Sequence, residues 1–269
     1  MSTQDTEPGS PQRSAWPLIV VLALVVAGVI VAGLVVLTRD DSDPDAETTA
    51  NPAPTSTAPV RDEADPSAEG FATPRSDALG RKVDVPRNGL GVILPQATDQ
   101  QKSFTDPGAM TTPAQGIRWQ QSAGVVIPFS TSDGPTRMDG QIPVGFAQTP
   151  AGAALAAASL TARLMDGRLA LESVEKRFDP TSPKYAEILS EARAMPAEVT
   201  LGDRVPRASG YEIGEDCDPS YCLVWLALPG LDGVTRTAPV PVVWNGDDWY
   251  LTDTSTPGRE GTDPGLVRW

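Results

Sequence analysis

The chain has 269 residues, with 21 Lys and Arg against 35 Asp and Glu, and its formal net charge is −14. Phosphate contacts need a basic surface, so this charge argues against direct binding of nucleic acid. The sequence has no histidine, which excludes a Ser/His/Asp triad, a Cys/His dyad and a histidine-ligated metal. Two cysteines are too few for a zinc site made of cysteines alone. We therefore assign no catalytic residue, no metal ligand and no cofactor from the sequence.

An apolar run near the N-terminus, Leu18 to Leu37, has no charged or hydrogen-bonding side chain. At 1.5 Å rise per residue, a helix over this run covers roughly 30 Å of hydrocarbon. The alternative is a cleaved signal peptide, whose apolar region is about 7 to 15 residues long and precedes a small-x-small cleavage site. The run is longer than that, so we expect a single transmembrane helix over 18–37 after a cytoplasmic tail over 1–17.

Within this run, Ala23 and Ala27, and Gly28 and Ala32, are small residues four positions apart. This spacing allows two membrane helices to approach closely, so these residues are candidates for packing against another span. Alanine and glycine are also common on lipid-facing surfaces, and that alternative stays open. One arginine flanks the run on each side, so the flanking charges do not orient it. The cysteine pair favours a C-terminal domain outside the cytoplasmic membrane.

Residues 38–80 are rich in Asp, Glu, Pro, Thr, Ser and Ala, and Phe71 is their one aromatic residue. Such a segment cannot bury enough apolar surface to offset the entropy of ordering, so we predict a disordered acidic tether. Its prolines favour extended conformations near 3.1 Å per residue, which gives a reach on the order of 100 Å. Residues 81–116 are transitional, because short apolar pieces alternate there with turns.

Residues 117–269 have the pattern of a folded domain. Thr149-Pro150 is a strong helix start, because a hydroxyl N-cap precedes a proline at the first helical position, and the Ala-rich helix continues to about Met165. Two further helices follow from apolar stripes, Leu171–Phe178 and Tyr185–Met195. The pattern predicts strands around Trp119 and at Gly124–Phe129, Gln141–Ala147, Glu198–Leu201, Gly210–Ile213, Cys222–Leu228, Thr235–Trp244 and Asp248–Thr252. Helices followed by an antiparallel sheet predict the α+β class.

Cys217 and Cys222 enclose four residues just before a predicted strand. The C-x4-C spacing does not fit a C-x-x-C redox motif, and partners for zinc are missing. We expect a local disulfide, worth about 2 kcal/mol in the chain-entropy model. Two free thiols are the alternative.

Two groups near the C-terminal strands are candidates for chemistry. Asp247, Asp248 and Asp253 flank the last hairpin, and carboxylate pairs can act as acid and base when burial separates their pKa values. Carboxylates beside a glycine turn more often shape the loop and stay solvated. Aromatic residues could line a pocket or fill the core and edges of the sheet; they are Tyr211, Tyr221, Trp225, Trp244, Trp249 and Tyr250.

The order of the predicted elements resembles the NTF2-like cone: a single N-terminal span, a low-complexity tether, helices and then a curved antiparallel sheet that ends in VVWNGDDWYLTD. VVIPFS, the Gly134-Pro135 turn and GFAQTPAGAALAAA resemble a family of membrane-anchored actinobacterial proteins encoded with conjugation modules. The resemblance covers roughly Trp119 to Thr252 and carries no catalytic motif. It implies an architecture like that of VirB8-like and TcpC-like conjugation-channel subunits or of Mce-associated proteins.

Two functions of different classes follow as expectations. The first is a non-catalytic, single-pass assembly or scaffold subunit of a cell-envelope machine, such as a conjugation or type IV secretion-like apparatus. Its partners would be the membrane, other envelope proteins or further copies of itself. The second is an extracytoplasmic small-molecule binder or isomerase-like NTF2-fold domain, which without histidine would need Asp, Glu, Tyr or Arg converging in a pocket. An Mce-associated membrane protein is a further alternative.

Overall fold

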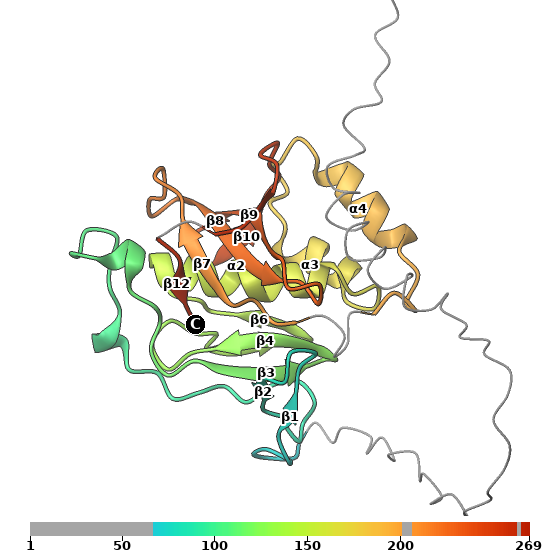
Figure 1. The fold of residues 1–269 in the computed structure, drawn as a ribbon. Helices are drawn as coiled ribbons and strands as arrows, with labels where there is room; N and C mark the ends of the chain where they lie inside the picture. The colour runs from blue at the N-terminus through green and yellow to red at the C-terminus, as the bar shows by residue number, and fades with distance from the viewer. Residues whose placement is uncertain (1–66, 201–205, 263–264) are drawn as a thin grey trace, which may run out of the picture. The chain divides into compact units, whose positions relative to one another are not determined.

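The computed structural model describes residues 67–200, 206–262 and 265–269 (Figure 1). The expected membrane run over 18–37, with Ala23, Ala27, Gly28 and Ala32, lies outside these residues. The described helices and strands are, in chain order, β1 (Arg75–Ser76), β2 (Lys82–Val83), η1 (Thr98–Gln100), η2 (Ala109–Thr111), β3 (Arg118–Ser122), β4 (Val125–Phe129), β5 (Arg137–Asp139), β6 (Ile142–Val144), α2 (Pro150–Leu164), α3 (Ala170–Arg177), α4 (Tyr185–Ala194), β7 (Gly210–Ile213), β8 (Tyr221–Pro229), β9 (Thr235–Trp244), β10 (Trp249–Leu251), β11 (Arg259–Glu260) and β12 (Val267–Arg268).

Strands β7 to β12 form one antiparallel sheet in the order β10-β9-β8-β7-β12, and β11 pairs with another part of β9. Every residue of β8 is paired with a residue of β9, so these two strands form the longest strand pair of the sheet. Side chains alternate across a strand. Cys222, Val224 and Leu226 of β8 are buried and face the core, while the residues between them face the opposite side of the sheet.

Helix α2 begins at Pro150, as the sequence predicts. The Thr149 side-chain oxygen accepts a hydrogen bond from the Gly152 N–H at 2.9 Å, which satisfies one of the open donors of the first turn. Alanine and leucine, which favour helices, fill the middle of the helix. Residues 150–160 are all buried, because the helix packs against β4 and β6 on one side and against β8, β9 and β10 on another. Figure 1 shows α2 running between these two β layers.

This arrangement corrects the expected fold. A membrane helix followed by helices on one face of a single curved sheet, the NTF2-like plan, is wrong for the described residues. They hold three α-helices and mostly antiparallel strands, which form a six-stranded sheet and three two-stranded sheets. The Ala-rich helix lies between β layers instead of on one sheet, and its small side chains allow both layers to come close. Among the described helices, none has the length and apolar character needed to cross a membrane.

The β layer below α2 has its own apolar cluster. The β3–β4 hairpin contributes Val125, Ile127 and Phe129, which pack with Leu94 and Leu169. Residues 67–116, which the sequence assigns to the tether and the transitional segment, contain the β1–β2 pair and the segment that leads to β3. The boundary expected at residue 80 therefore falls between two strands that pair with each other.

A glutamine side chain attaches the segment before β3 to the hairpin. The Gln120 side-chain amide donates to the Val92 carbonyl at 2.9 Å, and its oxygen accepts from the Val92 N–H at 2.8 Å. Gln120 is fully buried, so this pair of hydrogen bonds takes the place of a strand pairing. The sequence of the transitional segment does not show this contact, because it depends on a polar side chain more than twenty-five residues away.

Arg163, near the end of α2, is a fully buried cation. Its guanidinium donates to the Gln141 carbonyl and to the Ser122 hydroxyl oxygen, both at 2.6 Å, and so ties α2 to β3 and to the β5–β6 turn. Burial lowers the pKa of Arg163 to about 9, although the nearby charges of Glu172 and Asp166 oppose this effect. No apolar pattern marks this position as part of the core.

Most element predictions for residues 117–269 are confirmed to within a few residues. The predicted strand Glu198–Leu201 is wrong over its described part, because residues 197–198 form a turn after Pro196 and Val199 donates back to the Pro196 carbonyl at 3.0 Å. The short strands β1, β2, β5, β11 and β12 were not expected. Each is two or three residues long, too short for an alternating pattern to show in the sequence.

Candidate functional site

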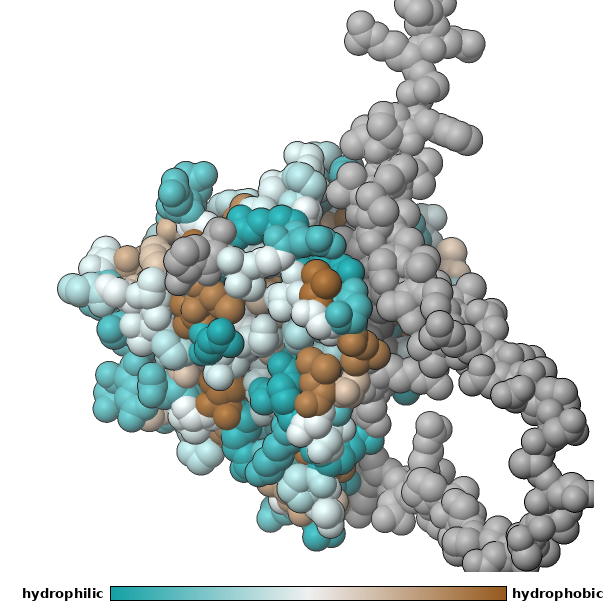
Figure 2. Space-filling view, in the orientation of Figure 1, coloured by the Kyte–Doolittle hydropathy of each residue, from teal (hydrophilic) through white to brown (hydrophobic). Residues whose placement is uncertain are grey.

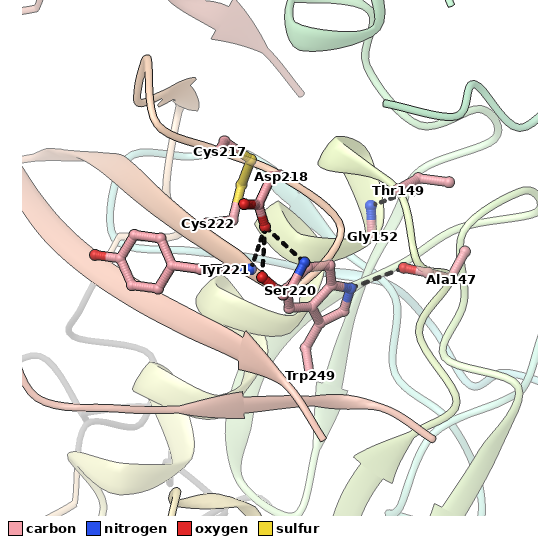
Figure 3. The surroundings of a disulfide bond; sticks show 9 residues. All are labelled: Ala147, Thr149, Gly152, Cys217, Asp218, Ser220, Tyr221, Cys222 and Trp249. Carbon is pink, nitrogen blue, oxygen red and sulfur yellow. Dashed lines mark hydrogen bonds between the residues drawn. A yellow bond between two sulfur atoms is a disulfide. The ribbon is translucent and has the colours of Figure 1, made fainter. Parts of the chain in front are cut away.

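Cys217 and Cys222 form a disulfide, as expected (Figure 3). The bond closes the loop between β7 and β8, and both cysteines are buried. Disulfides persist in oxidising compartments, so the bond is consistent with an extracytoplasmic domain. The closed loop is short, and its stabilising effect is about 2 kcal/mol in the chain-entropy model.

Hydrogen bonds shape the disulfide loop from inside and hold it from outside. The Asp218 carboxylate accepts from the N–H groups of Ser220 at 2.7 Å and Tyr221 at 2.9 Å. The bond from the Ser220 side chain and these backbone bonds lower the pKa of Asp218 below its ordinary value. The Gln148 side chain donates to the Pro219 carbonyl at 2.8 Å. The loop is therefore attached to the segment that leads into α2, which we call the junction loop (residues 145–149).

Asp248, one of the predicted carboxylate candidates, is fully buried directly before β10. It accepts hydrogen bonds from the N–H groups of Gly145 at 2.7 Å, Phe146 at 3.1 Å and Trp249 at 2.9 Å. The Arg177 Nε atom lies 3.9 Å from it. Burial raises the pKa of Asp248 above its ordinary value, although these donors and Arg177 oppose the effect. The carboxylate holds the junction loop against β10.

Asp133 is a second buried carboxylate that holds the same loop. The Thr149 hydroxyl donates to it at 2.6 Å, and the Ser132 hydroxyl donates at 2.5 Å. The Ala147 N–H donates to the Asp133 carbonyl at 3.1 Å. Because the same Thr149 oxygen caps α2, Asp133 fixes the N-cap of the most buried helix in the described residues. Sequence reasoning missed this residue, since an aspartate directly before the Gly134-Pro135 turn has the pattern of an ordinary turn residue.

These contacts decide the role of the carboxylates that the sequence singled out. The structure does not bring Asp247, Asp248 and Asp253 together at one site. Asp248 is saturated by backbone donors, Asp253 accepts from the Ser182 hydroxyl, and Asp247 is exposed in the β9–β10 turn. Within the part of the chain that the structure describes, no cluster of three or more acidic or cysteine side chains could hold a metal ion.

The aromatic candidates divide between the two faces of the six-stranded sheet. Tyr211 and Trp249 lie in the core, and Trp244 packs edge-on against Trp249 with ring centroids 5.3 Å apart. The Trp249 indole donates to the Ala147 carbonyl at 2.9 Å, which adds a third tie to the junction loop (Figure 3). These aromatics belong to the scaffold.

Other aromatics point away from α2. In the sheet register, Glu212 pairs with Trp225 and Trp225 pairs with Pro239, and residues paired across strands point to the same face. Tyr221, Val243 and Tyr250 form a parallel row. We call this surface the outer face; it is made of Glu212, Tyr221, Leu223, Trp225, Pro239, Pro241, Val243, Tyr250 and Arg259. In the view of Figure 2, brown apolar patches alternate with polar surface over this sheet.

The two prolines of the outer face lie inside β9. The Pro241 carbonyl accepts from the Thr252 N–H, so the main-chain groups of Pro241 face the side of β9 away from β8. Pro239 lies two residues earlier in β9, so its main-chain groups face the same side as those of Pro241. A proline nitrogen on that side removes no hydrogen bond to β8, which explains how a fully paired strand tolerates both residues.

A hollow of about 350 Å³ borders the outer face beside Trp225. The Arg259 guanidinium stacks over the Trp225 ring, 4.3 Å from its centroid, and forms an ion pair with Glu212. Glu215 and Met110 complete this wall of the hollow. The arrangement combines an aromatic face with charges of both signs. Sequence reasoning missed Glu212 and Arg259, because Arg259 comes from a two-residue strand and only the register places it over Trp225.

No curated protein and no solved structure matches the chain. One family model, described as Domain of unknown function (DUF8175), matches residues 84–265. That range includes α2, the disulfide loop, the outer face and most of both β layers, and it leaves out β1, β2 and β12. Since the match covers more than half of the sequence, the chain belongs to the DUF8175 family.

Proposed function

We propose that this protein is a non-catalytic assembly subunit of a cell-envelope machine, and that residues 67–269 work outside the cytoplasm by binding other envelope proteins. The observation that carries the proposal is the disulfide loop attached to the junction loop. Buried carboxylates Asp133 and Asp248, together with the Trp249 indole, all hold that junction. These buried polar groups, which could otherwise take part in catalysis, hold the junction loop in place.

A loop held in this way supports binding more than turnover. Rigid surfaces bind with a smaller loss of conformational entropy, because their side chains and loops are already ordered. The machine we propose is a conjugation or type IV secretion-like apparatus, with an Mce-associated assembly as the alternative. The conjugation-type machine follows from the segments VVIPFS and GFAQTPAGAALAAA, which resemble proteins encoded with conjugation modules. The Mce alternative rests on a likeness of architecture alone.

The proposed compartment has a direct test. Native envelopes are prepared without reductant, the protein is denatured and alkylated, and Cys217 and Cys222 are analysed by mass spectrometry. A domain in an oxidising compartment takes up no label before reduction and two labels after it. Two labels before reduction, in protein from freshly prepared envelopes, would place the domain in a reducing compartment and contradict the proposal.

Assembly is tested on the full-length protein extracted under native conditions. We expect it to migrate on native gels well above the 28.3 kDa of the chain, in a band that contains other envelope proteins. The control is the same extract after the complex is dissociated by denaturant. A species that stays monomeric in native extracts and binds or converts a small molecule would support the other class of function.

The hollow beside Trp225 favours small-molecule binding as the second candidate. Its volume of about 350 Å³ lies at the lower end of the range of ligand pockets, and it combines an aromatic ring with charges of both signs. Binding of small molecules by the full-length protein, measured by thermal shift and abolished by Trp225→Ala, would favour this candidate.

A further inference from the structure

We infer that the outer face of the six-stranded sheet is a docking surface for a protein partner that presents an apolar centre and a basic rim. This inference rests on the proposed function and names the surface and the chemistry of the partner.

The centre of the outer face has the composition of an interaction surface. Tyr221, Leu223, Trp225 and Val243 are half-buried, although they point away from the core. The inner face of the same sheet is covered by α2, whereas at the edge of the outer face Arg177 of α3 stacks over Tyr250, 4.9 Å from its ring centroid. Aromatic side chains with apolar neighbours are enriched at the centres of protein interfaces. The sheet already holds the backbone of these four residues in place.

Two acidic turns lie at one end of this face. The β7–β8 loop carries Glu215, Asp216 and Asp218, and the β9–β10 turn carries Asp247; all four are exposed. Both turns connect strands at the same end of the antiparallel sheet, next to Tyr221 and Trp244. Neither turn contains a lysine or an arginine. A partner that covers the apolar centre therefore meets only negative side chains in these two turns. Basic residues at the rim of the partner would complement that charge.

The same charges argue against other occupants. A second copy docked over this end would meet the same acidic turns, and like charges brought together at an interface are unfavourable. An anionic membrane surface attracts basic segments and repels acidic ones. The whole chain, at −14, strengthens both arguments. A heterologous protein with lysine or arginine around an apolar patch is the occupant that fits.

The hollow beside Trp225 offers an anchoring position for one of those basic side chains. Glu215 is exposed at its wall, and Trp225, over which Arg259 already stacks, supplies apolar surface beside it. Glu212 is already neutralised by Arg259. A long basic side chain can lay its apolar stem on the wall of the hollow and its charge near Glu215.

Site-specific photo-cross-linking in cells tests the docking surface with the full-length protein. A photoreactive phenylalanine derivative replaces Tyr221 or Leu223 on the outer face and, as control, Ser190 on the exposed side of α4. We expect a discrete heterologous product from the two outer-face positions and none from Ser190. Mass spectrometry of the cross-linked peptide should identify a partner segment in which lysine or arginine flanks apolar residues.

Charge reversal tests the chemistry of the partner. The triple variant Glu215→Lys, Asp216→Lys and Asp247→Lys changes three exposed side chains in turns, so the fold should be kept. We expect the cross-link yield from Tyr221 to fall about tenfold at low salt, because attraction across the rim becomes repulsion. The matched control reverses three exposed acids elsewhere, Asp99, Glu187 and Glu198, and should leave the yield unchanged.

Each remaining outcome overturns a definite part of the argument. A product of twice the chain mass would show that a second copy covers the face, and a lipid adduct would show that a membrane does. An unchanged yield in the triple Lys variant would remove the basic rim. Strong heterologous products from Ser190 alone would keep the assembly function but move the docking surface to α4. No protein product from any position would count against the docking surface and the proposed function together.

Discussion

Asp248 should be far more important for stability than its neighbour Asp247, although the two carboxylates are adjacent in the same turn. Asp248 is fully buried and accepts three backbone hydrogen bonds, whereas Asp247 is exposed. Asp248→Ala leaves the N–H groups of Gly145, Phe146 and Trp249 without their acceptor. An unsatisfied buried donor costs about 1–3 kcal/mol, so even at the low end of this range three of them lower the free energy of unfolding by about 3 kcal/mol or more.

A substitution of the same shape, Asp248→Asn, should remove only part of this stability. Asp248→Asn keeps one oxygen, which can serve the two donors that share Oδ1, and places an amide N–H₂ opposite the Gly145 N–H. One lost acceptor of the three then corresponds to about 1–3 kcal/mol. Asp247→Ala removes a solvated carboxylate, and surface changes of this kind stay within about 0.5 kcal/mol.

The assay is urea unfolding of the purified protein at neutral pH, followed by tryptophan fluorescence, since Trp249 and Trp244 pack together beside the altered site. The expected order of destabilisation is Asp248→Ala, then Asp248→Asn, then Asp247→Ala. The m-value should stay constant along the series, because the surface exposed on unfolding does not change. Equal midpoints for Asp248→Ala and Asp247→Ala would refute the reasoning, since burial and the three hydrogen bonds would then have no energetic weight.

Three further predictions concern the disulfide, the buried arginine and a partly buried ion pair. Reduction of the Cys217–Cys222 bond should lower the free energy of unfolding by about 2 kcal/mol, measured by chemical unfolding with and without reductant; the Cys217→Ser/Cys222→Ser variant should not respond to reductant. Arg163→Ala should destabilise by about 3–5 kcal/mol in the same assay, because a buried group and its hydrogen bonds are lost and a cavity is left, while Arg163→Met, which refills the volume, should cost less. Burial alone would raise the pKa of Asp84, but hydrogen bonds from Arg118 and Lys82 outweigh it and hold the pKa below 3.8. A lowered pKa contributes stability that is present above pH 3.8 and is lost as the pH falls through the lowered value. The difference in stability between wild type and Asp84→Asn should therefore be largest near pH 7 and shrink below pH 4.

Each of these has an outcome that contradicts it. A stability difference for Asp84→Asn that grows as the pH falls would reverse the sign of the linkage argument. Equal destabilisation by Arg163→Met and Arg163→Ala would show that packing volume plays no part at that site. A disulfide-free variant that still loses stability in reductant would mean that the measured loss has another source.

The local elements of residues 117–269 depend on short-range patterns, and the sequence alone determines most of them. Thr149-Pro150 starts α2 because the N-cap and the fixed proline dihedral act within one turn. The turn at Asn245-Gly246 joins β9 and β10 because glycine accepts the positive φ of 79° that the turn needs. The net charge, the absence of histidine and the spacing of the cysteine pair are equally independent of the fold.

Only the tertiary structure decided where those elements lie and what their side chains do. Alanine content shows that α2 needs close neighbours, but contacts with β4 and with β8, distant in the chain, place it between two layers. Asp247 and Asp248 have the same side chain and neighbouring positions, yet burial against Gly145 makes one a structural acceptor and leaves the other in solvent. Trp225 and Trp249 look alike in an apolar strand pattern, and the strand register puts one on the outer face and the other in the core. Residues far apart in sequence determine each of these outcomes, because burial and pairing are properties of the folded chain and no local pattern encodes them.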